Sequence, residues 1–151
     1  MVDLSALVDR TVHIDCDVVE ADGGTRCAAV SGGYLALHLA LKRAVDSGAL
    51  RNLPLNDSVA AVSVGVVGGM PVVDLEYEED CSAEVDMNVV MTGNGRLIEL
   101  QATAEAAPFE RSVLDELLGL AETSLGQIKN AQMEVITGSY VTGDAGSTAL
   151  S

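Results

Sequence analysis

The chain contains no tryptophan, one phenylalanine and three tyrosines, so aromatic residues make up only 3% of its 151 residues. Its length suits one domain of ordinary size or one and a half small ones, and a hydrophobic content of 48% allows a core of valine, leucine, isoleucine and alanine. Bases are scarce as well, since 8 lysines and arginines oppose 23 acids and give a formal net charge of −15. Such a charge repels nucleic acid unless a metal, a local basic patch or a partner subunit offsets it.

Disulfide, zinc and membrane signals are also lacking. The three cysteines form no CxxC pair and have no histidine at zinc-ligand spacing, which indicates a reducing compartment. No apolar run approaches the ~20 residues of a membrane span. The first residues lack the basic start and apolar stretch of a signal peptide. We therefore expect a cytoplasmic protein with no membrane partner.

Alternating apolar and polar residues over 11–19 predict a half-buried strand. Asp22-Gly23-Gly24 ends it, and a helix with apolar residues at helical spacing follows as far as Gly48. Because one strand and one helix cannot form a stable domain alone, a preceding segment or another chain must supply partners. Residues 49–57 resemble a linker, so we expect one partial domain over 1–53 and another domain over 58–137. Residues 138–151 are rich in Gly, Ser, Thr and Asp, which predicts a disordered tail.

The second domain is predicted to hold two hairpins and a long helix. The first hairpin runs from Val59 to Tyr77 and turns at Gly68-Gly69. The second runs over 85–103, and its turn, Gly93-Asn94-Gly95, contains the Asn-Gly pair that tolerates positive φ. A long helix then opens at Ser112, where Ser112 and Asp115 form a plausible capping box.

Two motifs carry candidate chemistry, and the first is Gly23-Gly24-Thr25-Arg26 at the start of the first helix. Free amides and the helix dipole favour an anion at such an end, and glycine lets the anion approach the main chain. Thr25 adds a hydroxyl donor, and Arg26 can bind a phosphate with two hydrogen bonds. A plain strand-to-helix turn with a surface arginine is the competing interpretation.

The second motif places five carboxylates between Glu78 and Asp86. If a strand begins near Glu84, then Glu84, Asp86 and Asn88 share one face, and Asp80 can fold back toward it. Adjacent carboxylates repel unless a cation joins them, and oxygen ligands suit Mg²⁺ or Mn²⁺. The competing interpretation is a solvated acidic loop.

Several blocks of the chain, taken in order, resemble the ribonuclease PH family. They are residues 10–18 followed by 21–26, then Asp74 to Asp80, Asp86 to Thr92, and Gln101 to Glu105 with Pro108-Phe109. The resemblance implies an α+β fold of the ribosomal-protein-S5 domain-2 type, with its second half complete and its first half truncated. It also implies a phosphate-dependent 3′-to-5′ exoribonuclease that trims tRNA precursors, releases nucleoside diphosphates and runs in reverse as a nucleotidyltransferase.

By the same resemblance, Gly24, Thr25 and Arg26 bind the phosphate co-substrate, while Asp80 and Asp86 are the catalytic or metal-binding (Mg²⁺ or Mn²⁺) aspartates. The implied partners are RNA, as tRNA 3′ ends, and further copies of the chain in a hexameric ring of dimers. Family members carry a basic segment before the position of Met1. Cys81 stands where they usually have serine, and Ala102 and Ala106 stand where glycine is common. Two alternatives are a non-catalytic ring subunit of an exosome-like assembly and a small acidic metal-binding or interaction domain unrelated to RNA.

Overall fold

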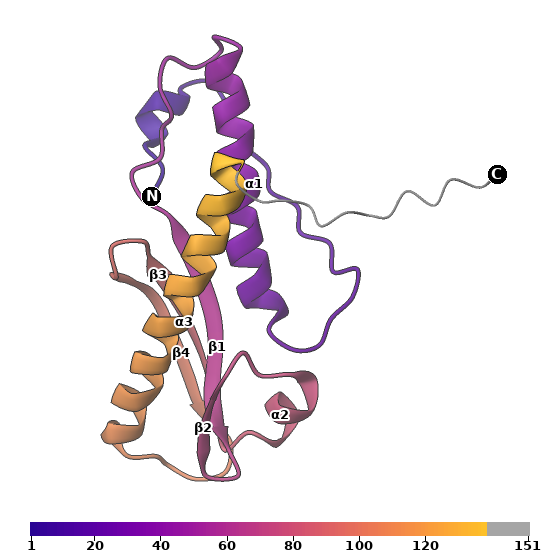
Figure 1. Ribbon diagram of the computed structural model, residues 1–151, viewed down its shortest axis with the longest axis vertical. Coiled ribbons are helices and arrows are strands. Elements are labelled where there is room, and N and C mark those ends of the chain that lie inside the picture. The colour runs from indigo at the N-terminus through magenta and orange to yellow at the C-terminus, as the bar shows by residue number, and fades with distance from the viewer. Residues whose placement is uncertain (139–151) are drawn as a thin grey trace, which may run out of the picture.

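The computed structural model describes residues 1–138, which form one antiparallel sheet with helices on both faces (Figure 1). Its strand order is β2-β1-β3-β4, and every neighbouring pair is antiparallel. The elements in chain order are η1 (Leu4–Leu7), α1 (Thr25–Asp46), β1 (Val59–Val67), β2 (Met70–Val73), α2 (Tyr77–Ser82), β3 (Val85–Thr92), β4 (Leu97–Ala104) and α3 (Arg111–Thr137).

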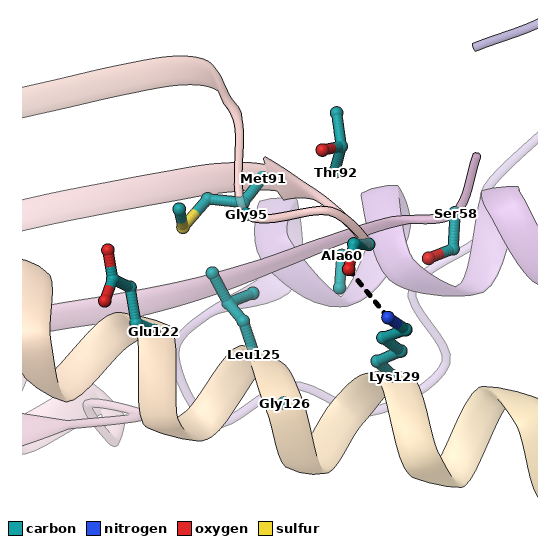
Figure 2. Close-up of a pocket in the computed structure, with 10 residues that line it drawn as sticks. Ser58, Ala60, Met91, Thr92, Gly95, Glu122, Leu125, Gly126 and Lys129 are labelled. Atoms are coloured by element: carbon teal, nitrogen blue, oxygen red, sulfur yellow. Dashed lines mark hydrogen bonds between the residues drawn. The ribbon is translucent and has the colours of Figure 1, made fainter. Parts of the chain in front are cut away.

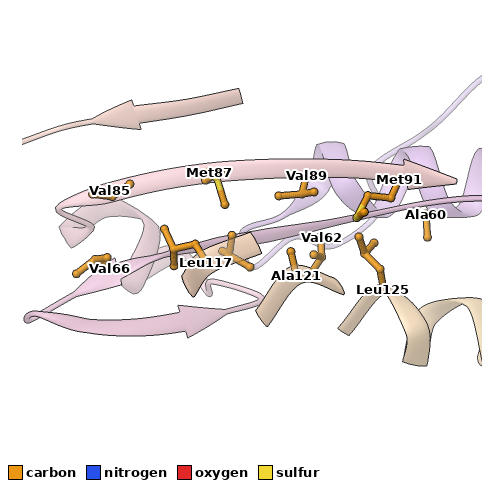
Figure 3. Close-up of a cluster of buried hydrophobic side chains, with 11 residues drawn as sticks. Ala60, Val62, Val66, Val85, Met87, Val89, Met91, Leu117, Ala121 and Leu125 are labelled. Carbon is orange, nitrogen blue, oxygen red and sulfur yellow. The ribbon is translucent and has the colours of Figure 1, made fainter. Parts of the chain in front are cut away.

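The main core lies between one face of the sheet and α3 (Figure 3). Alternate residues of β1 and β3 point to this face, because successive side chains in a strand point to opposite faces. Three α3 residues, Leu117, Ala121 and Leu125, pack against them, one helical turn apart. The sheet residues of this core are Ala60, Val62, Val64, Val66, Val85, Met87, Val89 and Met91.

The first helix covers the opposite face of the sheet. Cys27 near its start is buried against Ala61 and Val90, which alternate with the residues that face α3. Toward its far end, α1 packs through Leu41 against Leu7 and other apolar residues, and Figure 1 shows this end extending beyond the sheet. The start of α1 is therefore anchored on the sheet face that carries Asp86 and Asn88.

Most predicted elements are confirmed. Strands β1 and β3 have the predicted bounds, the glycine turns join both hairpins, and α1 follows Gly24. The first hairpin is shorter than predicted, because β2 ends at Val73 and residues 77–82 form a helix instead. The predicted capping box of the long helix is wrong, since the helix begins at Arg111 after Glu110, which makes no side-chain cap.

The predicted strand over 11–19 is also wrong. These residues have no regular structure and are exposed, including Val12, Ile14 and Val18. Within residues 1–138 no strand lies beside them to complete their backbone hydrogen bonds. The division into domains stays a prediction, and the predicted tail lies, apart from Gly138, outside the described residues. No helix of residues 1–138 is both long and apolar enough to cross a lipid bilayer.

Candidate functional site

The start of α1 presents unpaired main-chain donors. Gly24 is its N-cap, and the first intrahelical bond runs from Ala28 N to Gly24 O at 3.0 Å. The amides of Thr25 and Arg26 therefore have no acceptor within the helix. Gly23 and Gly24 both have positive φ, and a Cβ on Gly23 would collide with the Leu75 carbonyl oxygen. Glycine is thus required where the turn meets the segment that leads into α2.

Two contacts dock α2 beside this turn. Asp22 Oδ1 accepts a hydrogen bond from Tyr77 N at 3.1 Å, at the first residue of α2. Ser63 Oγ, buried in β1, accepts one from Leu75 N at 3.1 Å. Glu76 and Glu79 add a capping box at the start of the helix. These bonds fix the position of Asp80, which the sequence alone left in a loop.

The sheet supplies the floor of the site. Asp86 lies opposite Gly65 in β1, and Asn88 lies opposite Ser63, so these residues share the face that meets α1. A Cβ on Gly65 would collide with the Val85 carbonyl oxygen, so glycine is required opposite Asp86. Glu84, which was predicted to share this face, accepts a hydrogen bond from Gly69 N at 2.9 Å. The Glu84 carboxylate therefore binds the main chain of the β1–β2 turn.

One cavity of about 160 Å³ joins these parts. It brings together every residue predicted for phosphate or metal binding, namely Gly24, Thr25, Arg26, Asp80 and Asp86. The sequence-distant motifs therefore lie within reach of one small ligand, although the roles assigned to their side chains stay predictions. Ser63, Leu75 and Asn88 complete the lining.

The cavity disfavours the ionised form of Asp86. Asp86 is half-buried, and burial raises the pKa of its carboxyl group. The negative charges of Asp80 and Glu105 raise this pKa further. A bound cation would relieve both effects.

Two carboxylates in one cavity are compatible with a divalent cation. Among residues 1–138 no cluster of three or more His, Cys, Asp or Glu side chains is arranged to hold a metal. Mg²⁺ often binds through only one or two carboxylates and takes its other ligands from water and phosphate. Asp80 and Asp86 therefore fit a Mg²⁺ or Mn²⁺ ion that is shared with a phosphate ligand, and they do not form a complete protein cage.

Two contacts at the site were missed from the sequence. Arg26 Nη2 lies 2.7 Å from Glu99 of β4, and this hydrogen bond raises the pKa of Arg26 and lowers that of Glu99. Cys27 Sγ lies 2.9 Å from Asn88 Oδ1. The alternation of Asp86 and Asn88 along β3 pointed to Asn88, but no local pattern signals partners 73 and 61 residues away.

A larger cavity of about 310 Å³ lies on the other side of the sheet, between α3 and the β3–β4 turn (Figure 2). Lys129 Nζ donates a hydrogen bond to Gly93 O there at 2.6 Å. The apolar side chains of Met91 and Leu125 line it, and none of the residues predicted for the site does. The chemistry predicted from the sequence therefore belongs to the smaller cavity.

The sequence is similar to proteins of known family. The sequence model described as "3′ exoribonuclease family, domain 2" matches residues 57–124. A ribonuclease PH of Synechococcus sp. (strain CC9605) is 53% identical over 137 residues, which are 91% of this chain and 56% of that protein. A ribonuclease PH of Syntrophomonas wolfei is 50% identical over 90% of this chain and 57% of its own length. The chain thus spans little more than half the length of these relatives.

A solved structure supports the same fold. The crystal structure of rice (Oryza sativa) Rrp46 superimposes with a TM-score of 0.61 over 80% of this chain and 51% of the rice chain. At 16% sequence identity the likeness establishes a common fold. The predicted α+β fold of the ribosomal-protein-S5 domain-2 type is therefore confirmed.

Proposed function

We propose that the chain belongs to the 3′ exoribonuclease family and carries the reaction centre of a phosphate-dependent 3′-to-5′ exoribonuclease, because residues 57–124 match that family's sequence model and a ribonuclease PH is 53% identical over 137 residues. The observation that carries the proposal is the single cavity that holds a helix start, an arginine and two carboxylates. The proposed substrates are RNAs with 3′ extensions, tRNA precursors among them. The proposed setting is a cytoplasmic hexameric ring of dimers.

In the proposed reaction inorganic phosphate is the nucleophile. One phosphate oxygen bonds to the phosphorus of the last phosphodiester, and the bond from that phosphorus to the ribose 3′ oxygen breaks. The 3′ oxygen takes a proton and becomes the new RNA end, while the terminal nucleotide leaves as a nucleoside diphosphate. The amides of Thr25 and Arg26 with the Arg26 guanidinium hold and orient the phosphate.

Asp80 and Asp86 are the proposed ligands of Mg²⁺ or Mn²⁺. When bound, the ion would neutralise charge that develops on the departing oxygen. Because 23 acids against 8 bases repel RNA, we also propose that RNA binding depends on this divalent cation.

A labelled RNA with a 3′ extension tests the proposal, with phosphate and Mg²⁺ supplied. Two proteins are assayed: the chain itself, and a chimaera in which it replaces the matching stretch of the Synechococcus ribonuclease PH. We expect phosphate-dependent shortening with release of nucleoside diphosphates, lost in the Asp86→Asn variant. Lack of activity in both proteins would contradict an enzymatic role and favour a non-catalytic ring subunit.

A further inference from the structure

Arg26 lines the cavity, and its guanidinium contacts an acidic side chain that does not line it. Its Nη2 atom lies 2.7 Å from both carboxylate oxygens of Glu99, a residue 73 positions later in the chain. Both contacts use this one nitrogen. Within residues 1–138, Nε and Nη1 of Arg26 make no hydrogen bond, so these two nitrogens, which carry three N–H donors, remain for a ligand.

The position of Glu99 in the sheet explains why it does not block the site. Glu99 pairs with Val90 on β3, and Val90 pairs with Ala61 on β1. The cavity is lined instead by Asn88 and Asp86, the next two residues of β3 on the same face of the sheet as Val90. Glu99 therefore contacts Arg26 from the strand position beside the one that lines the cavity, and its side chain does not enter the cavity.

Two effects of Glu99 on phosphate binding have opposite signs. Its negative charge repels a phosphate, so its removal would tighten binding if repulsion dominated. Its contact with Arg26 restricts a long side chain that would otherwise lose rotamer freedom when it binds a ligand. Both side chains are partly exposed, at 50% for Arg26 and 39% for Glu99, so solvent and salt screen the repulsion.

We propose that Glu99 is a positioning residue, which holds the Arg26 guanidinium at the cavity and thereby prepares it to bind phosphate. This inference rests on the proposed phosphate site. Glu99 itself does not touch the phosphate and acts only through Arg26.

Calorimetric titration of the full chain with inorganic phosphate, at a fixed Mg²⁺ concentration, tests the proposal. We expect Glu99→Gln to raise the Kd for phosphate about fivefold or more. The matched control is Asp46→Asn, which removes an exposed ion pair whose residues do not line the cavity, Lys42 Nζ to Asp46 Oδ1 at 2.9 Å. This control should leave the Kd for phosphate unchanged. In an Arg26→Gln background, Glu99→Gln should not raise this Kd further, because Glu99 would have no guanidinium left to position.

Mn²⁺ titration followed by electron paramagnetic resonance separates positioning from a structural role. Glu99→Gln should leave the Mn²⁺ affinity unchanged, so a loss of both phosphate and Mn²⁺ affinity would overturn the inference. Unchanged or tighter phosphate binding by Glu99→Gln would overturn it as well, while wild-type binding would preserve the proposed phosphate site. No phosphate binding by the wild-type chain would overturn both.

Discussion

Cys27 Sγ donates a hydrogen bond to Asn88 Oδ1 over 2.9 Å, which joins the first turn of α1 to the middle of β3. Burial raises the pKa of the Cys27 thiol to about 11, so the group remains a neutral donor at physiological pH. The bond fixes the free amides of Thr25 and Arg26 above the sheet face that carries Asp86. Cys27 therefore has a structural role and is a poor nucleophile.

Alkylation of the folded chain tests this assignment. With its pKa at about 11, roughly one Cys27 thiol in a thousand is ionised at pH 8, and the side chain is buried. We expect iodoacetamide to modify the exposed Cys16 and Cys81 first and to spare Cys27, as mapped by peptide mass spectrometry. Denatured protein is the control, in which all three should react. Equal labelling of Cys27 in the folded chain would contradict the packing described.

Gly23→Ala should destabilise the fold more than Gly48→Ala. Both glycines have a φ of +77°, so alanine at either position costs about 1–2 kcal/mol in backbone strain. Only at Gly23 does the new Cβ collide with a main-chain carbonyl, that of Leu75, whereas nothing lies within 4 Å at Gly48. Urea denaturation should show an additional loss of about 1 kcal/mol or more for Gly23→Ala. Equal losses would mean that the turn does not approach the segment before α2.

Asp86→Asn should stabilise the metal-free chain at pH 7. Folding raises the pKa of Asp86 above its ordinary value of 3.8, so ionisation of this carboxyl group disfavours the folded state. The free energy of unfolding therefore falls as the pH rises from 3.8 through the raised pKa. Well below pH 3.8 the group is protonated in both states, so the gain should vanish. Thermal unfolding at both pH values measures this. Asp17→Asn, in the exposed segment 11–19, is the control for net charge, and an equal gain from it would contradict the prediction.

Ser63→Ala should weaken both the fold and the proposed metal site. It leaves the amide of Leu75 without its acceptor, at a cost of about 1–3 kcal/mol, and loosens the segment that positions Asp80. Ser31→Ala is a matched control, since Ser31 Oγ likewise accepts from a main-chain amide, that of Ala61, at 3.0 Å. Chemical denaturation should show losses for both variants. Mn²⁺ affinity should fall only for Ser63→Ala, and unchanged affinity would mean that Ser63 does not support Asp80.

The elements that local patterns specify were predictable from the sequence. The hairpins follow from period-two alternation and glycine turns, and α1 follows from helical spacing after Gly24. The strand over 11–19 failed because alternation alone cannot form a strand without a neighbouring strand. Helix α2 was missed because its apolar content is low, and long-range bonds such as Asp22 to Tyr77 N hold it in place.

The site was predictable as two motifs but not as one cavity. The helix start at Gly24 to Arg26 and the acids Asp80 and Asp86 each have a local signature, whereas their meeting depends on the register of β1 with β3. The bond between Arg26 and Glu99 joins residues of two separate elements, so only the folded chain shows it. Sequence reasoning thus found residues that line the cavity and missed the side chains that hold them in place.

A crystal structure of the chain soaked with Mn²⁺ and inorganic phosphate tests the central claim most directly. We expect an anomalous Mn²⁺ peak about 2.1–2.2 Å from carboxylate oxygens of Asp80 and Asp86. We also expect a phosphate about 3 Å from the amides of Thr25 and Arg26, in the same cavity. Metal and phosphate bound at separate surfaces, or a cavity that takes up neither under these conditions, would contradict it.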